Sequence, residues 1–215
     1  MDDRPKWTES LSCKIEDGLM VVNGVGGYLL PGDAQLLTFF ATKLPGNARI
    51  AEIGSFMGLS GLLMARALYC KGEYSTKIYC IDTWEGSPEH QSMKAVREGQ
   101  LFEIFKTNIA RSGLASYFIP IRKDSAAASL DFQDRSLDLI FIDGDHSFKG
   151  CLADLEAWYP KLKPGGILLG HDGENEVRQA VEFFLQGKDL SCITFGVPGF
   201  SNYFYRIVER GSLLV

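Results

Sequence analysis

Apolar residues recur along the chain in two patterns, and these two patterns alternate. Stretches in which they fall every three or four positions predict helices, and short, continuously apolar runs predict buried strands. The predicted helices cover residues 33–44, 59–70, 101–109, 152–162 and 177–185. The predicted strands cover residues 48–53, 78–81, 118–121, 137–142 and 167–169. Strands without polar alternation, separated by helices, are typical of a parallel sheet that is covered on both faces, which is an α/β fold.

The two ends of the chain follow other patterns. Residues 1–32 are predicted to be an irregular segment that serves as a substrate lid. Residues 191–195 and 202–208 predict two strands joined by a glycine-containing turn. No repeat, low-complexity tract or linker divides the chain. We therefore expect a single domain over residues 33–215, with a Rossmann-like, doubly wound sheet that is mostly parallel and has an antiparallel C-terminal strand pair.

Composition narrows the class of protein. Of 215 residues, 46% are hydrophobic and 23% are charged, as in globular domains. The formal net charge of −5 and the scattered Lys and Arg residues argue against a nucleic-acid partner. The five cysteines show no metal-ligand or disulfide spacing, which suits a reducing compartment. The first residues do not form a signal peptide, and no apolar run reaches the ~20 residues that span a bilayer. We expect a cytoplasmic protein without a membrane partner.

Ligands of a doubly wound sheet bind beyond the carboxyl ends of its strands. The first predicted strand is followed by a turn with Gly54 and Gly58, which lets the backbone approach a ligand closely. The next strand ends at Asp82, whose carboxylate can accept hydrogen bonds from ribose hydroxyls. Dinucleotide dehydrogenases and methyltransferases share this combination. The turn lacks Gly-x-Gly-x-x-Gly and with it the close pyrophosphate cradle, which favours S-adenosylmethionine, a cofactor without phosphate.

Four segments carry a more specific resemblance. In chain order they are Glu52-Ile-Gly-Ser-Phe-x-Gly-x-Ser60, Ile81-Asp-Thr-Trp-x-Gly86, Phe141-Ile-Asp-Gly-Asp-His-Ser-Phe148 and Leu162-Lys-Pro-Gly-Gly-Ile-Leu-Leu-Gly-His-Asp172. Together they resemble the class I methyltransferases, and within these the small-molecule O-methyltransferases. The Asp-Gly-Asp-His natural-product and sugar enzymes, related to the catechol and caffeoyl-coenzyme A enzymes, are the most similar group. The resemblance covers roughly residues 33–208. It implies methyl transfer from S-adenosylmethionine to a hydroxyl of a sugar or phenol, in families where homodimers are common.

The resemblance also implies a cofactor site, position by position. The residues that match the segment holding the methionine portion are Glu52, Gly54, Ser55, Gly58 and Ser60. Asp82 matches the ribose-binding acid, followed by Thr83 and by Trp84 close to the adenine. Asp124 and Ser125 match residues that bracket the adenine ring, although an ordinary helix cap explains the pair equally well.

The same family resemblance implies a divalent cation, most simply Mg²⁺. Asp143 and Asp172 end strands that are neighbours in this fold, about 4.8 Å apart, so their carboxylates can share one ion, and Asp143 also borders the cofactor. In the metal-dependent relatives the ion holds the acceptor hydroxyl and lowers its pKa. Those relatives usually carry Asn or Asp where this chain has Gly173, so His171 is the candidate that completes the ligand set. The alternative is that Asp172 caps a turn and no metal binds.

Two neighbouring residues are candidates for the general base. Asp145 matches the base proposed for some sugar-type relatives, and His146 stands where the catechol-type enzymes keep a lysine. An imidazole is suited to accepting a proton near neutral pH. Three alternatives stay open: metal-independent methylation with His146 as the sole base, a nicotinamide-dependent oxidoreductase, and a catalytically silent module that binds S-adenosylmethionine. The sequence does not identify the acceptor.

Overall fold

The computed structural model describes residues 7–16, 18–87, 90–173 and 175–186, together with the backbone of strands at 190–195 and 204–209. The strands are β1 (Cys13–Glu16), β2 (Leu19–Val22), β3 (Val25–Gly27), β4 (Arg49–Ile53), β5 (Lys77–Asp82), β6 (Phe118–Arg122), β7 (Leu137–Ile142), β8 (Leu162–Gly170), β9 (Leu190–Phe195) and β10 (Phe204–Glu209). The α-helices are α1 (Pro31–Lys43), α2 (Leu59–Lys71), α3 (Lys94–Arg97), α4 (Leu101–Ser112), α5 (Ser125–Ser129), α6 (Phe148–Trp158) and α7 (Asn175–Leu185). Among these helices, none is both long and apolar enough to cross a bilayer.

One large sheet organises the domain, with the strand order β6-β5-β4-β7-β8-β10-β9. The first five strands in this order are parallel, which confirms the predicted α/β fold. Strand β10 pairs antiparallel with both β8 and β9, and the turn predicted between β9 and β10 lies outside the described residues. The chain winds outward in both directions from the neighbouring strands β4 and β7. Ligands bind at such a switch point, beyond the carboxyl ends of the two strands.

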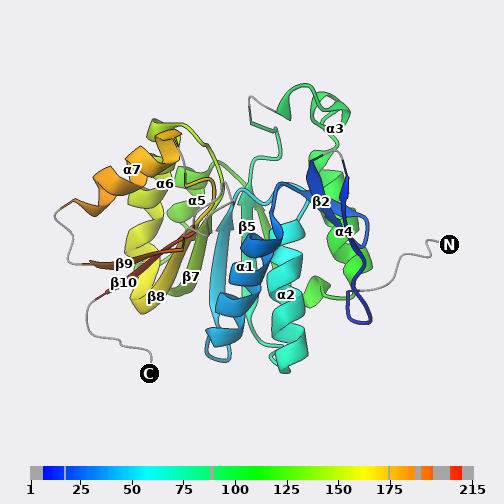
Figure 1. Ribbon diagram of the computed structural model, residues 1–215, viewed down its shortest axis with the longest axis horizontal. Helices are drawn as coiled ribbons and strands as arrows, with labels where there is room; N and C mark the ends of the chain where they lie inside the picture. The colour runs from blue at the N-terminus through cyan, green and yellow to red at the C-terminus, as the bar shows by residue number, and fades with distance from the viewer. Residues whose placement is uncertain are drawn as a thin grey trace.

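The sheet separates two hydrophobic cores, as Figure 1 shows in the two helical layers. Along β7, Leu139 and Phe141 face the core that contains the buried sides of α1, α2 and α4. Ile140 and Ile142 face the other core, against α6 and α7. Because successive side chains of a strand point to opposite faces, a strand buried on both sides is mostly apolar. This is why β7 is apolar from Leu139 to Ile142, while the buried Asp138 near its start is paired with the Arg49 N–H and Lys163 Nζ.

A second, antiparallel sheet lies at the N-terminal end of the chain, where β1 pairs with β2 and β2 with β3. The expectation of an irregular segment over residues 1–32 was therefore wrong for residues 13–27. Strands of three or four residues are too short to show a convincing alternation. The decisive signal was the dipeptide Asn23-Gly24 between β2 and β3, where both residues have positive φ, 48° and 79°. That combination is the two-residue hairpin turn that Asn-Gly favours.

Candidate active site

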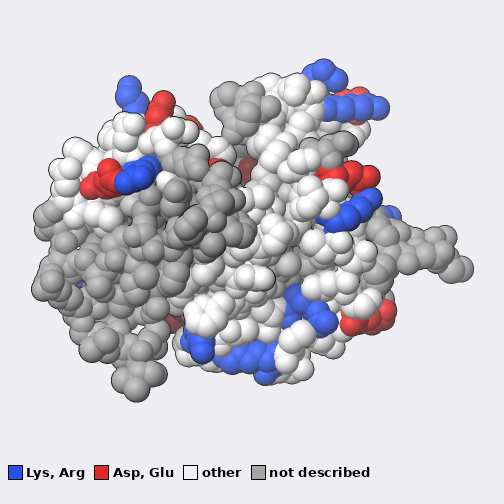
Figure 2. All heavy atoms as spheres, viewed as in Figure 1, with Lys and Arg blue, Asp and Glu red and all other residues white. Residues whose placement is uncertain are grey.

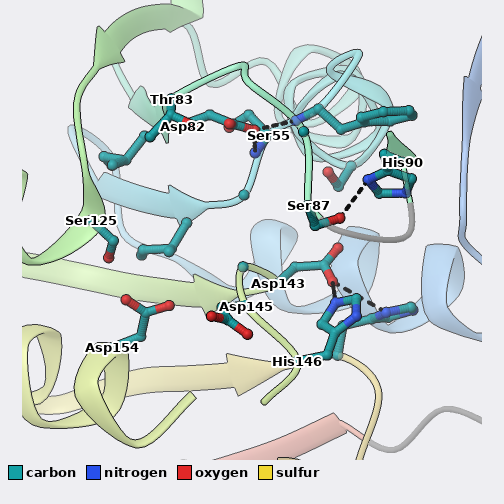
Figure 3. A pocket seen from close by; sticks show the side chains of 18 of the residues that line it. Ser55, Asp82, Thr83, Ser87, His90, Ser125, Asp143, Asp145, His146 and Asp154 are labelled. Atoms are coloured by element: carbon teal, nitrogen blue, oxygen red, sulfur yellow. Dashed lines mark hydrogen bonds and ion pairs between the residues drawn. The ribbon is translucent and has the colours of Figure 1, made fainter. Parts of the chain in front are cut away.

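A cavity of about 700 Å³ opens beyond the carboxyl ends of β4, β5, β7 and β8. The loops after these strands form its floor and sides, and Gly26–Leu29 at the end of β3 form another wall. Figure 3 shows side chains from several of these loops pointing into the same space. The predicted residues that line the cavity are Gly54, Ser55, Ser60, Asp82, Thr83, Asp124, Ser125, Asp143, Asp145, His146, His171 and Asp172.

The glycine turn after β4 is shaped by close backbone contact with the loop after β7. Gly54 has φ +84°, and a Cβ atom added there would lie 1.9 Å from the carbonyl oxygen of Asp143. Two hydrogen bonds fix the main chain here: the Gly54 N–H donates to Ile81 O of β5 at 2.9 Å, and the Asp143 N–H donates to Ile53 O of β4 at 2.8 Å. Only glycine therefore allows the turn after β4 to come this close to the loop that carries Asp143.

Replacing Gly54 with alanine is expected to destabilise the domain by more than about 2 kcal/mol, because backbone atoms must shift to make room for the methyl group. Gly72 offers a matched control, since it has φ +79° but nothing within 4 Å of an added Cβ. Gly72→Ala should lose only about 1 kcal/mol, the cost of the positive φ. Urea unfolding of the two variants tests this, and equal midpoints would contradict the close contact at Gly54.

Three residues predicted to touch the cofactor stand behind the cavity wall. Glu52 is fully buried and accepts hydrogen bonds from Ser60 Oγ at 2.6 Å and Ser55 Oγ at 2.7 Å. Burial raises the pKa of Glu52 to about 7, although these hydrogen bonds oppose the rise. Gly58 faces the rings of α4, and the buried Trp84 donates from Nε1 to Phe56 O at 2.8 Å. Glu52, Gly58 and Trp84 thus hold the loops in place rather than line the cavity.

Asp82 ends β5 and organises the turn opposite it. Its Oδ2 accepts the backbone N–H groups of Ser55 at 3.0 Å and Phe56 at 2.8 Å, and its Oδ1 accepts the N–H of Trp84 at 2.7 Å. Burial raises the pKa of Asp82 above its ordinary value despite these three bonds. A carboxylate has about four lone-pair sites, so Asp82 can still accept hydrogen bonds from a ligand in the cavity.

The two predicted bases lie on different sides of the loop after β7. Asp145 accepts the N–H of Ser147 at 2.8 Å and packs against Gly150 at the start of α6. His146 lies with Asp143 instead, as Figure 3 shows, while Asp145 is on the side of Asp154. The structure therefore groups His146 with the predicted metal ligands and separates Asp145 from them.

Asp154, on α6, is a cavity residue that the sequence analysis missed. Its side chain is 6% exposed and lies in the same part of the cavity as Ser125. Burial raises the pKa of Asp154 to about 6, with contributions from the carboxylates of Asp124 and Asp145, while a hydrogen bond with Ser125 opposes the rise. A signal was present in the sequence, because a carboxylate sits here within the apolar stripe of a helix.

The raised pKa of Asp154 predicts a pH-dependent stability difference. The folded domain binds this proton more tightly than the unfolded chain, so the contribution of Asp154 to the free energy of unfolding falls as pH rises from about 4 to about 6. Asp154→Asn removes the ionisation. The variant should gain stability relative to the original chain across that window, reaching on the order of 2 kcal/mol at pH 7. Thermal unfolding at pH 4 and pH 7 measures this; a difference that does not change with pH would contradict it.

Asp143, His146 and Asp172 bring one ligand atom each to within 4.8 Å of one another, a spacing that can hold a metal ion. His146 Nε2 lies 3.1 Å from Asp172 Oδ2 and 3.7 Å from Asp143 Oδ1. His171 approaches the same two carboxylates from the protein interior, with Nδ1 3.3 Å from Asp143 Oδ1 and 3.2 Å from Asp172 Oδ2. The structure thus offers two imidazoles to the predicted aspartate pair, one facing the cavity and one buried.

The charges of this cluster stabilise one another. Burial opposes ionisation of Asp143, but the positive charge of His171 and hydrogen bonds from His146 and His171 outweigh it, and the pKa of Asp143 lies well below its ordinary value. Burial also opposes protonation of His171, yet attraction to Asp143 and hydrogen bonds with Asp143, Asp172 and Asp33 raise the pKa of His171 to about 12. The position of the buried imidazole between carboxylates therefore favours its protonated form.

Aromatic rings form a further part of the cavity wall. The ring of His90 stacks on Tyr28 with centroids 5.1 Å apart and on Phe56 with centroids 4.9 Å apart. His90 Nδ1 lies 2.7 Å from Ser87 Oγ, which fixes the ring. All three rings line the cavity. Tyr28 and Phe56 were not predicted, because their approach depends on β3 and on the positive φ of Phe56, 45°.

The matching family model, described as a methyltransferase domain, covers residues 51–173. This span begins in β4 and ends just after Asp172, so it contains the glycine turn and the aspartates that end β5, β7 and β8. The chain belongs to the methyltransferase-domain family. Only the N-terminal wall of the cavity, at Gly26–Leu29, lies outside the matched span.

Relatives of this methyltransferase domain differ in length, and the solved ones share its fold. An uncharacterized protein, y4gI of Sinorhizobium fredii, is 33% identical over 127 residues, which is 59% of this chain but only 13% of the length of that relative. The O-methyltransferase from Bacillus cereus, solved in complex with S-adenosylhomocysteine, has a TM-score of 0.61 at 19% identity, with 84% of this chain and 82% of that chain covered. The O-methyltransferase TomG from Streptomyces achromogenes, involved in tomaymycin synthesis and solved with S-adenosylmethionine, has a TM-score of 0.61 at 16% identity, with 84% and 81% covered. At these identities, the two solved structures show the shared fold.

Proposed function

We propose that this methyltransferase domain transfers a methyl group from S-adenosylmethionine to a hydroxyl group of a small molecule, at a site that also holds a divalent cation. The observation that carries the proposal is the placement of Asp143, His146 and Asp172 in the same cavity as the glycine turn and Asp82. A sulfonium donor is already activated, so alignment with the acceptor and removal of the acceptor proton are the remaining chemical tasks.

The cofactor end of the cavity has groups that suit S-adenosylmethionine. We assign the ribose hydroxyls to Asp82, which keeps one lone-pair site free beside Ser55 and Thr83. We assign the adenine to the opposite side, where Asp124, Ser125 and the unpredicted Asp154 line the cavity. The carboxylates along this path also complement the positive charge of the sulfonium. The Bacillus cereus enzyme was solved with S-adenosylhomocysteine and the Streptomyces achromogenes enzyme with S-adenosylmethionine, which supports a cofactor of this kind in the shared fold.

The acceptor end fits a cation. Carboxylate oxygens from Asp143 and Asp172 are hard ligands of the kind Mg²⁺ prefers, and the imidazole of His171 beside them supplies a ligand that Gly173 cannot. When bound, the cation would stabilise the oxyanion form of the acceptor hydroxyl. Asp143 and Asp172 would hold the cation, and the neighbouring His146 and His171 favour the ionised form of these carboxylates.

We assign the general base to His146. Its side chain is 41% exposed and faces the cavity, whereas Asp145 is engaged with Ser147 and Gly150 at the start of α6. The neighbouring Asp172 Oδ2, 3.1 Å from Nε2, favours the protonated imidazole that forms after the proton is taken. Replacement of a general base typically slows a reaction roughly 10²–10⁴-fold.

The acceptor is proposed to be a small ring-shaped molecule, a sugar or a phenol. Tyr28, Phe56 and His90 form an aromatic surface in the cavity wall, and such surfaces stack on planar or apolar ring faces. On the face shown in Figure 2, the described Lys and Arg side chains are spread over several places, among them the lower ends of α1 and α2 and the tip near α3, and most have Asp or Glu side chains beside them. This distribution favours a small molecule over a nucleic acid, which needs basic side chains around the site.

The test is product formation from a panel of catechols and sugars, measured by mass spectrometry with S-adenosylmethionine and Mg²⁺. We expect a methylated product and S-adenosylhomocysteine in equal amounts, loss of the reaction with a chelator, and a slow reaction for His146→Gln. Lys106→Gln, on the exposed face of α4, serves as the control that should leave the rate unchanged. Binding of S-adenosylhomocysteine without product from any acceptor would favour the silent module instead. Product formation that resists the chelator would contradict the cation.

A further inference from the structure

Asp33 is a buried carboxylate that the proposed reaction does not use. It lies in the first turn of α1 and is 2% exposed, and it does not line the cavity. Its Oδ2 accepts the N–H of Leu30 at 2.8 Å and lies 3.3 Å from Nε2 of His171, 138 residues further along the chain. Because burying a carboxylate costs free energy unless it is paired, the position of Asp33 against the His171 imidazole needs an explanation.

The partner of Asp33 faces the candidate cation site with its other nitrogen. The side chain of His171 is 2% exposed, and Nδ1 lies between Asp143 Oδ1 and Asp172 Oδ2, at 3.3 Å and 3.2 Å. These separations match those of ligand atoms around one small divalent ion. A metal-binding histidine almost always donates its second N–H to a carboxylate or carbonyl group, which fixes the ring and its tautomer. Asp33, His171 and the aspartate pair have this arrangement.

A helix-capping role alone does not account for Asp33. The bond from the Leu30 N–H uses one lone pair of Oδ2, and an aspartate at a solvent-facing helix start can provide the same bond. Burial against His171 adds nothing to the cap. Asp33 Oδ2 instead connects the N-terminal wall of the cavity with His171. It binds the N–H of Leu30, which directly follows Tyr28 and Leu29 in that wall, and it also contacts the His171 ring.

We propose that Asp33 is a positioning residue: it holds the His171 ring with Nδ1 directed at the cation site and fastens the N-terminal wall of the cavity to that site. His171 Nδ1 then serves as the third protein ligand beside Asp143 and Asp172, and His146 is left to act on the acceptor. The proposal rests on the proposed function for its cation. It assigns no contact between Asp33 and the reacting atoms.

The first test is the affinity of the protein for Mn²⁺, measured by electron paramagnetic resonance in the presence of saturating S-adenosylhomocysteine. Asp33→Asn keeps the size of the side chain and an oxygen for the Leu30 N–H, but removes the charge that faces His171. We expect its Mn²⁺ affinity to fall roughly 10–100-fold, the usual effect of removing an outer-shell partner, with little change in S-adenosylhomocysteine affinity.

Asp138→Asn is the matched control. Asp138 is also a buried carboxylate, 8% exposed, and accepts hydrogen bonds from the Arg49 N–H and from Lys163 Nζ near the start of β7, far from its carboxyl end. Its loss should lower the melting temperature without changing Mn²⁺ affinity. If Asp33→Asn also lowers only the melting temperature, Asp33 is a helix cap and the proposal is wrong.

A second measurement uses the unmodified protein and does not depend on a variant that folds. In ¹⁵N spectra of the histidine rings, Mg²⁺ should shift Nδ1 of His171 to the value of a metal-bound nitrogen while Nε2 keeps its proton. A spectrum in which His171 does not respond to bound Mg²⁺ would overturn the proposal but leave the proposed reaction intact. If the protein binds S-adenosylhomocysteine but neither cation, the cation half of the proposed function fails, and the role of Asp33 fails with it.

Discussion

Alanine at Asp172 is expected to lower the rate of methyl transfer roughly 10³-fold or more, while S-adenosylhomocysteine affinity changes little. Asp172 lies in the loop after β8, and its Oδ2 lies within 3.2 Å of a nitrogen of each of the two histidines. Its removal takes away one of two carboxylates that can hold the cation and leaves two imidazoles facing each other. The cofactor end of the cavity, at Asp82 and Ser55, is not touched. Single-turnover rates and calorimetric titration separate the two effects.

A second variant separates charge from backbone strain at this position. Asp172 has φ 52°, a conformation that asparagine tolerates better than alanine does. Asp172→Asn should therefore keep the stability of the fold and still lose most of the activity. Activity close to the original in both variants would contradict the cation-assisted reaction and would favour methylation with His146 as the sole base.

Alanine at Asp82 is expected to weaken S-adenosylhomocysteine binding by about 100-fold or more. Asp82 accepts three backbone N–H groups from the two loops that form the cofactor end, and hydrogen bonds to a charged group contribute about 1.5–3 kcal/mol each. The variant loses both the contact with the ribose and the geometry of the turn. Isothermal titration measures the change.

Asp124→Asn provides the comparison for Asp82. Asp124 also lines the cavity, but its Oδ1 accepts the N–H of Ala127 as the cap of α5. Asparagine caps a helix as well as aspartate does, so this variant should bind S-adenosylhomocysteine within a few-fold of the original. An Asp82 variant that binds as tightly as the Asp124 variant would show that the cofactor lies elsewhere.

The parallel sheet could be predicted because burial on both faces leaves a direct trace in the sequence. Strands such as β7 are apolar at nearly every position, and the helices between them keep their own periodicity. The N-terminal sheet left almost no such trace. Its strands are too short for a pattern, and the turn at Asn23-Gly24 was the one local signal that required a hairpin. Packing of these short strands on the domain depends on contacts that are distant in sequence.

Within the site, the sequence predicted which residues lie at the strand ends better than it predicted where their side chains point. The rule that ligands bind beyond strand ends identified Asp82, Asp143 and Asp172 correctly as cavity residues. It could not show that Asp145 and His146, although adjacent, lie on different sides of their loop. Nor could it place Glu52 behind the glycine turn, because a motif gives the order of residues and not the direction of a side chain.

Two of the residues that the sequence analysis missed or undervalued share one property. Asp154 and Asp33 are carboxylates on the buried sides of helices, and each lies against a loop that follows a strand. A charged residue inside an apolar helical stripe is unfavourable unless something pairs with it. In both helices, this mismatch between residue type and position was the available signal. Identifying the partner required the folded structure, since His171 lies far from Asp33 in the sequence.

The measurement that tests the account most directly is isothermal titration of the purified protein with S-adenosylhomocysteine, with and without Mg²⁺, and with NAD as the control ligand. We predict micromolar binding of S-adenosylhomocysteine and no heat from NAD. The Asp82→Ala variant should lose this binding, and the Asp172→Ala variant should keep it. Absence of S-adenosylhomocysteine binding, or preferential binding of NAD, would contradict the proposed use of this cavity.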